Sequence, residues 1–113
     1  MRSIFLAALV IVASTAVAYS QTSATRKAIE ANLKTFVEEF NKGNAAAVAQ
    51  IYAADAKLLP PNDKIVEGRA NIQAFWQGAS GAGLKLTSLS ITTLTPAGNL
   101  LVETGKYVTT IPA

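Results

Sequence analysis

The 113-residue sequence contains no cysteine and no histidine. The lack of cysteine excludes disulfides, thiolate nucleophiles and iron–sulfur ligation. The lack of histidine excludes a Ser-His catalytic triad and histidine-ligated metal sites. Any acid–base chemistry must therefore use Asp, Glu, Tyr or Lys side chains, and we expect neither a metal site nor a cofactor.

Charge is also scarce, since Asp, Glu, Lys and Arg together make up 15% of the chain. Ten basic and seven acidic residues leave a net charge of +3. The basic residues are scattered singly apart from the Arg26-Lys27 pair, a pattern typical of a solvated surface rather than a nucleic-acid-binding stripe. We therefore expect no nucleic-acid partner.

Residues 1–20 are predicted to be a signal peptide. A basic residue, Arg2, precedes an apolar run at Ile4–Val12, and small residues at Ala18 and Ser20 offer cleavage positions. A retained membrane anchor is the alternative, but the apolar run is shorter than the about 20 residues that a spanning helix needs. The prediction is an exported protein, periplasmic or secreted, with no membrane attachment after the signal is removed.

The stretch at residues 26–59 organises the remaining domain. Apolar residues recur with the spacing of one helical stripe, namely Ile29, Leu33, Phe36, Val37 and Phe40. Gly43 is predicted to end this helix, because glycine adopts a left-handed C-cap without steric cost. Asn44 is a good N-cap for a short second helix, which Asp55 ends. A strand at Ala56–Leu59 then stops at two prolines, which cannot donate to a sheet.

The rest of the chain alternates turn signals with apolar segments. The predicted elements are a short strand at Lys64–Glu67, a helix at Ala70–Gln77, a flexible loop at Gly78–Gly83, and two long strands at Leu84–Thr95 and Leu100–Ile111 joined by a turn at Pro96–Asn99. The apolar alternation of the first long strand changes phase, which predicts a bulge near Thr87-Ser88. Helices followed by a hairpin indicate an α+β fold, with the helices packed on an antiparallel sheet.

Several segments follow one another in an informative order. They are Phe36–Phe40, Asn41–Asn44, Ile51–Ala56, Leu59–Pro61, Gly68-Arg69 with Ile72, Phe75-Trp76, and the alternating Glu103, Gly105 and Tyr107. Over residues 26–111 this order resembles the nuclear transport factor 2-like superfamily, and within it the SnoaL-like branch near the ketosteroid isomerases. The resemblance implies a curved antiparallel sheet wrapped into a cone, closed at one end by the helices over an apolar pocket. Members include isomerases, polyketide cyclases, dehydratases, oligomerisation modules and many exported proteins of unknown role, so the fold alone does not give the function.

The sequence departs from the family pattern in two ways. The family domain continues with another hairpin pair, so we expect the cone domain at residues 21–113 to lack its last strands and to expose a sheet edge. We expect this sequence to be truncated, and the alternative is a native short form that completes its sheet through a partner. In addition, the aspartate base of the isomerases aligns with Pro60 and their oxyanion tyrosine with Phe36. Neither residue can perform that chemistry, so steroid isomerisation is not expected.

Two residues of the last strand are candidates for catalysis. Glu103 is predicted to lie on the same face of its strand as Leu101, Gly105 and Tyr107, because alternate residues of a strand share a face. If this face lines the cone, Glu103 is a carboxylate in an apolar setting suited to general acid–base catalysis, and Tyr107 can donate a hydrogen bond to a ligand oxygen. The alternatives are a strand-edge glutamate that faces water and a core tyrosine with a satisfied hydroxyl.

Aromatic side chains are the candidates for ligand binding. The candidate apolar pocket wall consists of Phe36, Tyr52, Phe75 and Trp76, and Tyr107 is the fifth ligand-binding candidate through its hydroxyl. The alternative is plain core packing, because a stripe at helical spacing is usually core. Both can hold at once, since core residues at the mouth of a cone also line its pocket.

Three functional hypotheses follow. The leading one is an exported SnoaL-like domain that binds a small apolar or amphipathic molecule. The second is a lyase, isomerase or hydrolase that uses Glu103 with Tyr107. The third is an oligomerisation module, because a free sheet edge favours pairing, and a homodimer is the expected assembly.

Overall fold

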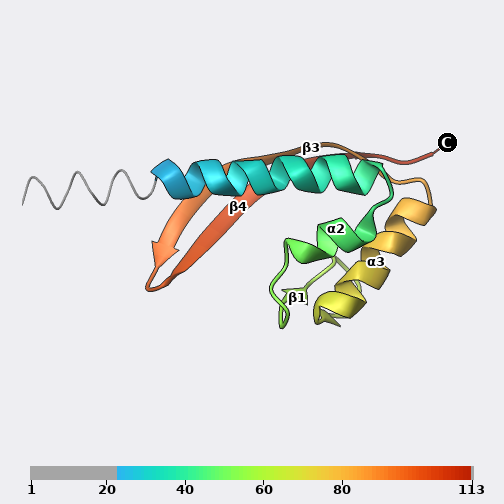
Figure 1. The fold of residues 1–113 in the computed structure, drawn as a ribbon, viewed down its shortest axis with the longest axis horizontal. Coiled ribbons are helices and arrows are strands. Elements are labelled where there is room, and N and C mark those ends of the chain that lie inside the picture. Colours follow the sequence, from blue (N-terminus) through green and yellow to red (C-terminus); the bar gives the residue numbers. More distant parts are fainter. Residues whose placement is uncertain (1–22, 113) are drawn as a thin grey trace, which may run out of the picture. The chain divides into compact units, whose positions relative to one another are not determined.

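A computed structural model describes residues 23–112 (Figure 1). The predicted signal peptide at residues 1–20 lies outside this described part, so it stays a prediction. The chain divides into two units, residues 1–30 and 31–113, and the described residues of each are considered separately. Among the described residues, none of the helices has both the length and the apolar character needed to cross a membrane.

In the first unit, residues 23–30 are helical and mostly exposed. Ile29 is partly buried, and Arg26 forms an ion pair with Glu30 one helical turn later, at 3.1 Å between Nε and Oε1. The helix continues to residue 41 in the second unit. There the predicted stripe is confirmed, because Phe36 and Phe40 are buried while Leu33 and Val37 are partly buried.

A sharp corner after residue 41 is fixed by two predicted residues. Gly43 has the left-handed φ of +81° that its C-cap role requires. Asn44 caps α2 (Ala45–Gln50), because its side-chain oxygen accepts a hydrogen bond from the Ala47 N–H at 3.3 Å. Its amide nitrogen also donates to Glu39 Oε2 at 2.8 Å. That bond, with a further contribution from Lys42, lowers the pKa of the Glu39 carboxyl.

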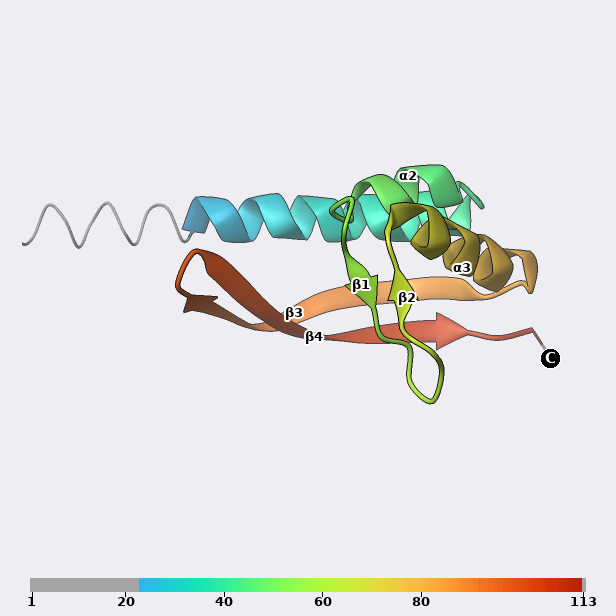
Figure 2. The same ribbon diagram turned by 90° about the horizontal axis from the view of Figure 1, so that it is seen from below.

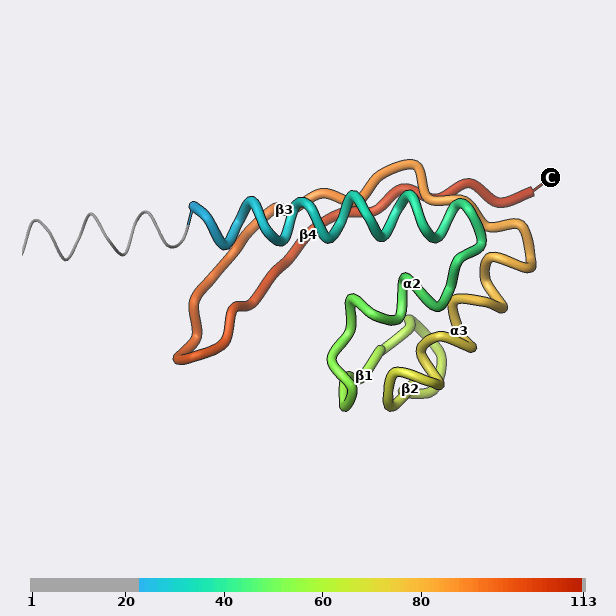
Figure 3. Tube along the Cα trace, viewed as in Figure 1, coloured from blue at the N-terminus to red at the C-terminus, as the bar shows by residue number. Residues whose placement is uncertain are grey.

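After α2 the chain forms a small antiparallel pair and then returns beside α2. The pair consists of β1 (Lys57–Leu58) and β2 (Val66–Glu67), both shorter than predicted. Figure 3 shows the chain running out through these strands and back into α3 (Arg69–Gly81), which packs against α2.

The predicted flexible loop at Gly78–Gly83 is wrong for its first four residues, since α3 continues to Gly81. The apolar stripe of the helix extends from Ile72 through Trp76 to Ala79, and Ala79 packs against the buried core. This packing offsets the helix cost of each glycine, about 1 kcal/mol relative to alanine. The helix ends where Gly83 adopts a φ of +89°.

The second sheet is a long antiparallel hairpin of β3 (Lys85–Ala97) and β4 (Leu100–Thr110), whose strands run alongside each other in Figure 2. Its register shifts between Leu86 and Ser88, which confirms the predicted bulge. A second shift lies between Ile91 and Thr93 and was not predicted. Side chains of paired residues share a face. The two bulges therefore keep the partly or fully buried residues of β3 on one face, namely Leu86, Leu89, Ile91 and Leu94.

Gly105 of β4 sits opposite Ile91, between the two bulges. A Cβ atom at this position would collide with the backbone carbonyl oxygen of Ser90. Backbone atoms of a paired strand cannot move aside cheaply, so a side chain is not tolerated here. The glycine thus permits the close approach of the strands at this point.

The α+β class is confirmed, since helices are followed by antiparallel strands. Within residues 23–112 the strands form two separate two-stranded sheets and no closed barrel. The core is small, and its buried apolar residues are Phe36, Phe40, Ala45, Val48, Ala49, Ile72 and Leu86. It therefore lies between the end of the long helix, α2, α3 and the start of β3.

Candidate functional site

An aromatic cluster occupies the centre of this core. We define it as Phe36 and Phe40 from the long helix, Tyr52 from the segment after α2, and Phe75 and Trp76 from α3. The Trp76 ring meets Phe36 at a centroid distance of 5.2 Å and 90°, and Phe40 at 5.6 Å and 83°. These are the edge-to-face arrangements that aromatic pairs prefer. Trp76 therefore joins α3 to the end of the long helix.

The rings of the aromatic cluster are not equally buried. Phe36 and Phe40 are buried, whereas Tyr52, Phe75 and Trp76 keep part of their surface exposed. Phe75 touches Trp76 at a centroid distance of 5.1 Å, and Tyr52 meets Phe36 at 6.3 Å. One side of the cluster is thus core, and the other presents aromatic surface.

Tyr52 and Trp76 are also joined by a hydrogen bond. The indole Nε1–H of Trp76 donates to the Tyr52 hydroxyl oxygen at 3.2 Å. Burial raises the pKa of Tyr52 above its ordinary value of 10.0, and the bond from Trp76 opposes this in part. The hydroxyl therefore stays protonated and neutral throughout the physiological pH range.

Arg69 fixes the backbone of Tyr52. Its guanidinium donates two hydrogen bonds to the Tyr52 carbonyl oxygen, from Nε at 3.1 Å and from an Nη nitrogen at 2.7 Å. This carbonyl lies just past the end of α2, where helix carbonyls lack intrahelical donors. Because Arg69 is the first residue of α3, the contact ties the end of one helix to the start of the other.

The start of β3 closes the cluster on the sheet side. Leu86 is buried, and Leu84 and Leu89 pack against the same core. The Asn41 side chain pairs with the Leu86 backbone like a neighbouring strand. Its Nδ2 donates to the Leu86 carbonyl at 2.7 Å, and its Oδ1 accepts from the Leu86 N–H at 2.8 Å. The apolar face of β3 is thereby held against the end of the long helix.

A family model described as the SnoaL-like domain matches residues 33–113. The chain belongs to the SnoaL-like family. The match begins within the long helix and includes every element that carries the aromatic cluster. No curated protein matches this sequence.

Solved structures share the fold of this SnoaL-like domain. A domain of unknown function with a cystatin-like fold from Nostoc punctiforme aligns with a TM-score of 0.69 and 19% identity, over 79% of this chain and 57% of that one. A ketosteroid isomerase-like protein from Erwinia carotovora atroseptica aligns with a TM-score of 0.51 and 18% identity, over 63% and 55%. An NTF2-like protein with a cystatin-like fold from Novosphingobium aromaticivorans gives 0.54 and 14%, over 77% and 70%.

These similarities concern the fold, because the identities are low. The chain spans little more than half the length of the first two structures, 57% and 55% respectively. The nuclear transport factor 2-like resemblance that the sequence indicated is thus confirmed for the described architecture.

The SnoaL-like domain brings together four of the five predicted ligand-binding residues. Phe36, Tyr52, Phe75 and Trp76 all belong to the aromatic cluster. Tyr107 lies on β4 opposite Leu89 and is 63% exposed. Among the described residues, no ring contact joins Tyr107 to the cluster.

Glu103 and Tyr107 share one face of β4, on either side of Gly105, as the strand parity predicted. Both side chains are exposed, and they are paired with Leu94 and Leu89 on the apolar face of β3. Their catalytic role stays a prediction. The described residues also contain no group of three or more acidic side chains placed to hold a metal ion.

Sequence reasoning missed Arg69 as a residue of this site. Its partner is a backbone carbonyl 17 positions away, and such an acceptor leaves no residue-type signal in the sequence. The Asn41–Leu86 bridge was missed for the same reason. In both cases a side chain binds backbone that only the tertiary fold brings near.

We predict that Arg69→Ala lowers the free energy of unfolding by about 1–3 kcal/mol, because the Tyr52 carbonyl loses two charge-assisted donors in a partly buried site. Urea denaturation followed by far-UV circular dichroism measures this loss. Arg26→Ala is the matched control, since it removes a guanidinium from an exposed ion pair worth about 0.2–0.5 kcal/mol. Equal effects of the two substitutions would contradict the role given to Arg69.

Proposed function

We propose that this exported SnoaL-like domain binds a small apolar or amphipathic molecule against the aromatic cluster. The observation that carries the proposal is the partial exposure of Tyr52, Phe75 and Trp76 beside the fully packed Phe36 and Phe40. Partly exposed apolar rings that lie next to one another form an apolar surface patch, and such patches are a feature of ligand-binding sites. Exposed aromatic surface with one polar group is the composition of a small-molecule site.

Two further features support this proposal. The SnoaL-like family match covers the elements that carry the cluster, and small-molecule binding is common in that family. The rings come from separate segments that are held by specific hydrogen bonds, so the exposed aromatic surface is already organised before a ligand arrives. Such preorganisation reduces the entropy lost on binding.

A neutral fluorescent probe, N-phenyl-1-naphthylamine, tests the proposal. We expect saturating probe to raise the melting temperature, because a ligand that binds only the folded state stabilises it, by about 2.7 kcal/mol at 100 times its dissociation constant. Phe75→Leu should weaken probe binding several-fold. Ile111→Ala, which shortens a side chain that is 77% exposed after β4, is the control and should leave binding unchanged. No change in melting temperature, or equal loss in both variants, would contradict the proposal.

A second candidate function is homo-oligomerisation through β4. Among the described strands β4 pairs only with β3, and Val102 and Val108 are 51% and 52% exposed on one face of it. An apolar strand with an open edge favours pairing with another strand.

Sedimentation velocity over a concentration series tests this second candidate. We expect a concentration-dependent dimer that Val102→Lys disrupts, because a charge on an edge strand opposes pairing. Thr92→Lys places the same charge at the exposed bulge of β3 and should leave the dimer intact. A monomer at every concentration would exclude this function.

A further inference from the structure

The side chains of the aromatic cluster carry two polar groups, the Tyr52 hydroxyl and the Trp76 indole N–H, and these two groups bond to each other. An indole N–H can only donate, so in the 3.2 Å bond between Trp76 and Tyr52 the tyrosine oxygen must be the acceptor. The hydroxyl hydrogen of Tyr52 is therefore directed elsewhere. Within the described part of the chain, no residue accepts it.

The position of this hydroxyl is fixed at three points. Arg69 holds the Tyr52 carbonyl through two hydrogen bonds, Phe36 packs against the tyrosine ring at 62°, and Trp76 binds the hydroxyl oxygen. A donor held in this way gives more selectivity than a mobile one, because little freedom is lost when it binds. Tyr52 also stays protonated, since burial raises its pKa, so it acts as a donor across the physiological pH range.

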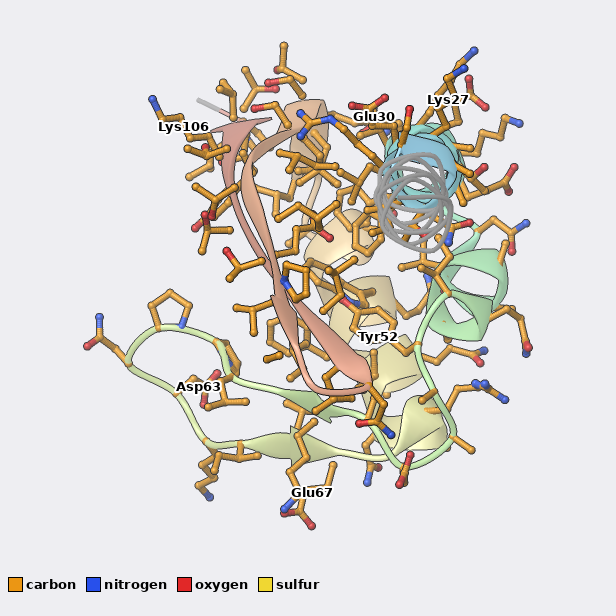
Figure 4. All side chains as sticks on the ribbon, turned by 90° about the vertical axis from the view of Figure 1, so that its left-hand side faces the viewer. Lys27, Glu30, Tyr52, Asp63, Glu67 and Lys106 are labelled. Carbon is orange, nitrogen blue, oxygen red and sulfur yellow. The ribbon has the colours of Figure 1, made fainter. Side chains whose placement is uncertain are left out.

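The charges around Tyr52 favour a neutral partner. The other members of the aromatic cluster cannot ionise. The Arg69 guanidinium is bound at the backbone carbonyl of Tyr52, at the other end of the residue from the hydroxyl, and Glu67 points away from Tyr52 (Figure 4), where it pairs with Lys57 at 3.4 Å. Among the described residues, no cationic side chain is hydrogen-bonded to the Tyr52 hydroxyl, so an anionic ligand bound there would lose water without a direct counter-charge.

We propose that the Tyr52 hydroxyl is a specificity-determining hydrogen-bond donor, which selects neutral apolar molecules carrying an acceptor oxygen over hydrocarbons and over carboxylates. This inference rests on the proposed small-molecule binding and adds the chemical class of the ligand. Tyr52 is a ligand-contacting residue in this account, and Trp76 and Arg69 position it.

The test uses three probes with one carbon skeleton: tetralin, 1-tetralone and tetralin-1-carboxylate. Isothermal titration calorimetry gives their affinities for the wild-type protein and for Tyr52→Phe, which removes only the hydroxyl. We expect Tyr52→Phe to weaken 1-tetralone binding about three- to tenfold, the worth of one hydrogen bond, and to leave tetralin binding unchanged. Unchanged tetralin binding also shows that the variant is folded.

Infrared spectroscopy of bound 1-tetralone provides a second measurement, which needs no variant to fold. We expect its carbonyl stretch to shift to lower frequency in the wild-type complex relative to an alkane solution, because a hydrogen bond weakens the C=O bond. Tyr52→Phe should abolish the shift.

The other outcomes separate the inference from the proposal on which it rests. Equal effects of Tyr52→Phe on tetralin and 1-tetralone, or an unshifted carbonyl stretch, would overturn the donor role while leaving small-molecule binding in place. Tightest binding of the carboxylate would overturn the neutral ligand class. Binding of none of the three probes, together with no stabilisation by N-phenyl-1-naphthylamine, would overturn the proposed function and this inference with it.

Discussion

The packing of Trp76 against Phe36 and Phe40 is the contact on which the described structure depends. It joins α3 to the end of the long helix, at centroid distances of 5.2 and 5.6 Å. A domain of this size has few residues that can be buried completely, so one large side chain in contact with several elements carries a large share of the stability. Tyr52 and Arg69 extend this contact to α2, and Leu86 extends it to β3.

The same cluster that stabilises the fold also carries the proposed function. Its inner rings, Phe36 and Phe40, are fully packed, and its outer rings remain accessible. Aromatic surface that stays accessible to a ligand is not buried in the core, so the proposed site lowers the stability of the domain. The polar bridges from Arg69 and Asn41 offset part of that cost, because each satisfies backbone groups beside the cluster.

The hairpin obeys a different constraint. The apolar residues of β3 after Leu86 lie on the same face as Leu86 only because the register shifts at two bulges. Its partner β4 carries exposed apolar residues, among them Leu100 and Val102. The start of β3 is therefore buried against the helices, whereas most side chains of β4 are exposed. This difference is the basis of the second candidate function.

Local patterns in the sequence were sufficient to predict part of this structure. The stripe through Phe36 and Phe40, the Asn44 cap and the first bulge each depend on residues close together in the chain. The extension of α3 through Gly78 could not be predicted, because packing of Ala79 overrides the low helix propensity of glycine.

The candidate site could be predicted only in part. Phe36, Tyr52, Phe75 and Trp76 were identified from their aromatic character and their place on helices. Arg69 was not, because its acceptor is a distant backbone carbonyl. Tyr107 was predicted to lie in the pocket because alternate residues of a strand share a face. This alternation predicts the face on which a side chain lies, but it does not predict what covers that face.

The most direct test of the central claim uses Trp76, the single tryptophan of the chain, as an intrinsic probe. Urea unfolding is followed by Trp76 fluorescence and by far-UV circular dichroism in the same samples. If the contacts of Trp76 hold the helices together, the two transitions coincide, as one cooperative event requires. Fluorescence that reports a solvent-exposed Trp76 at urea concentrations where helix content is still intact would contradict the account.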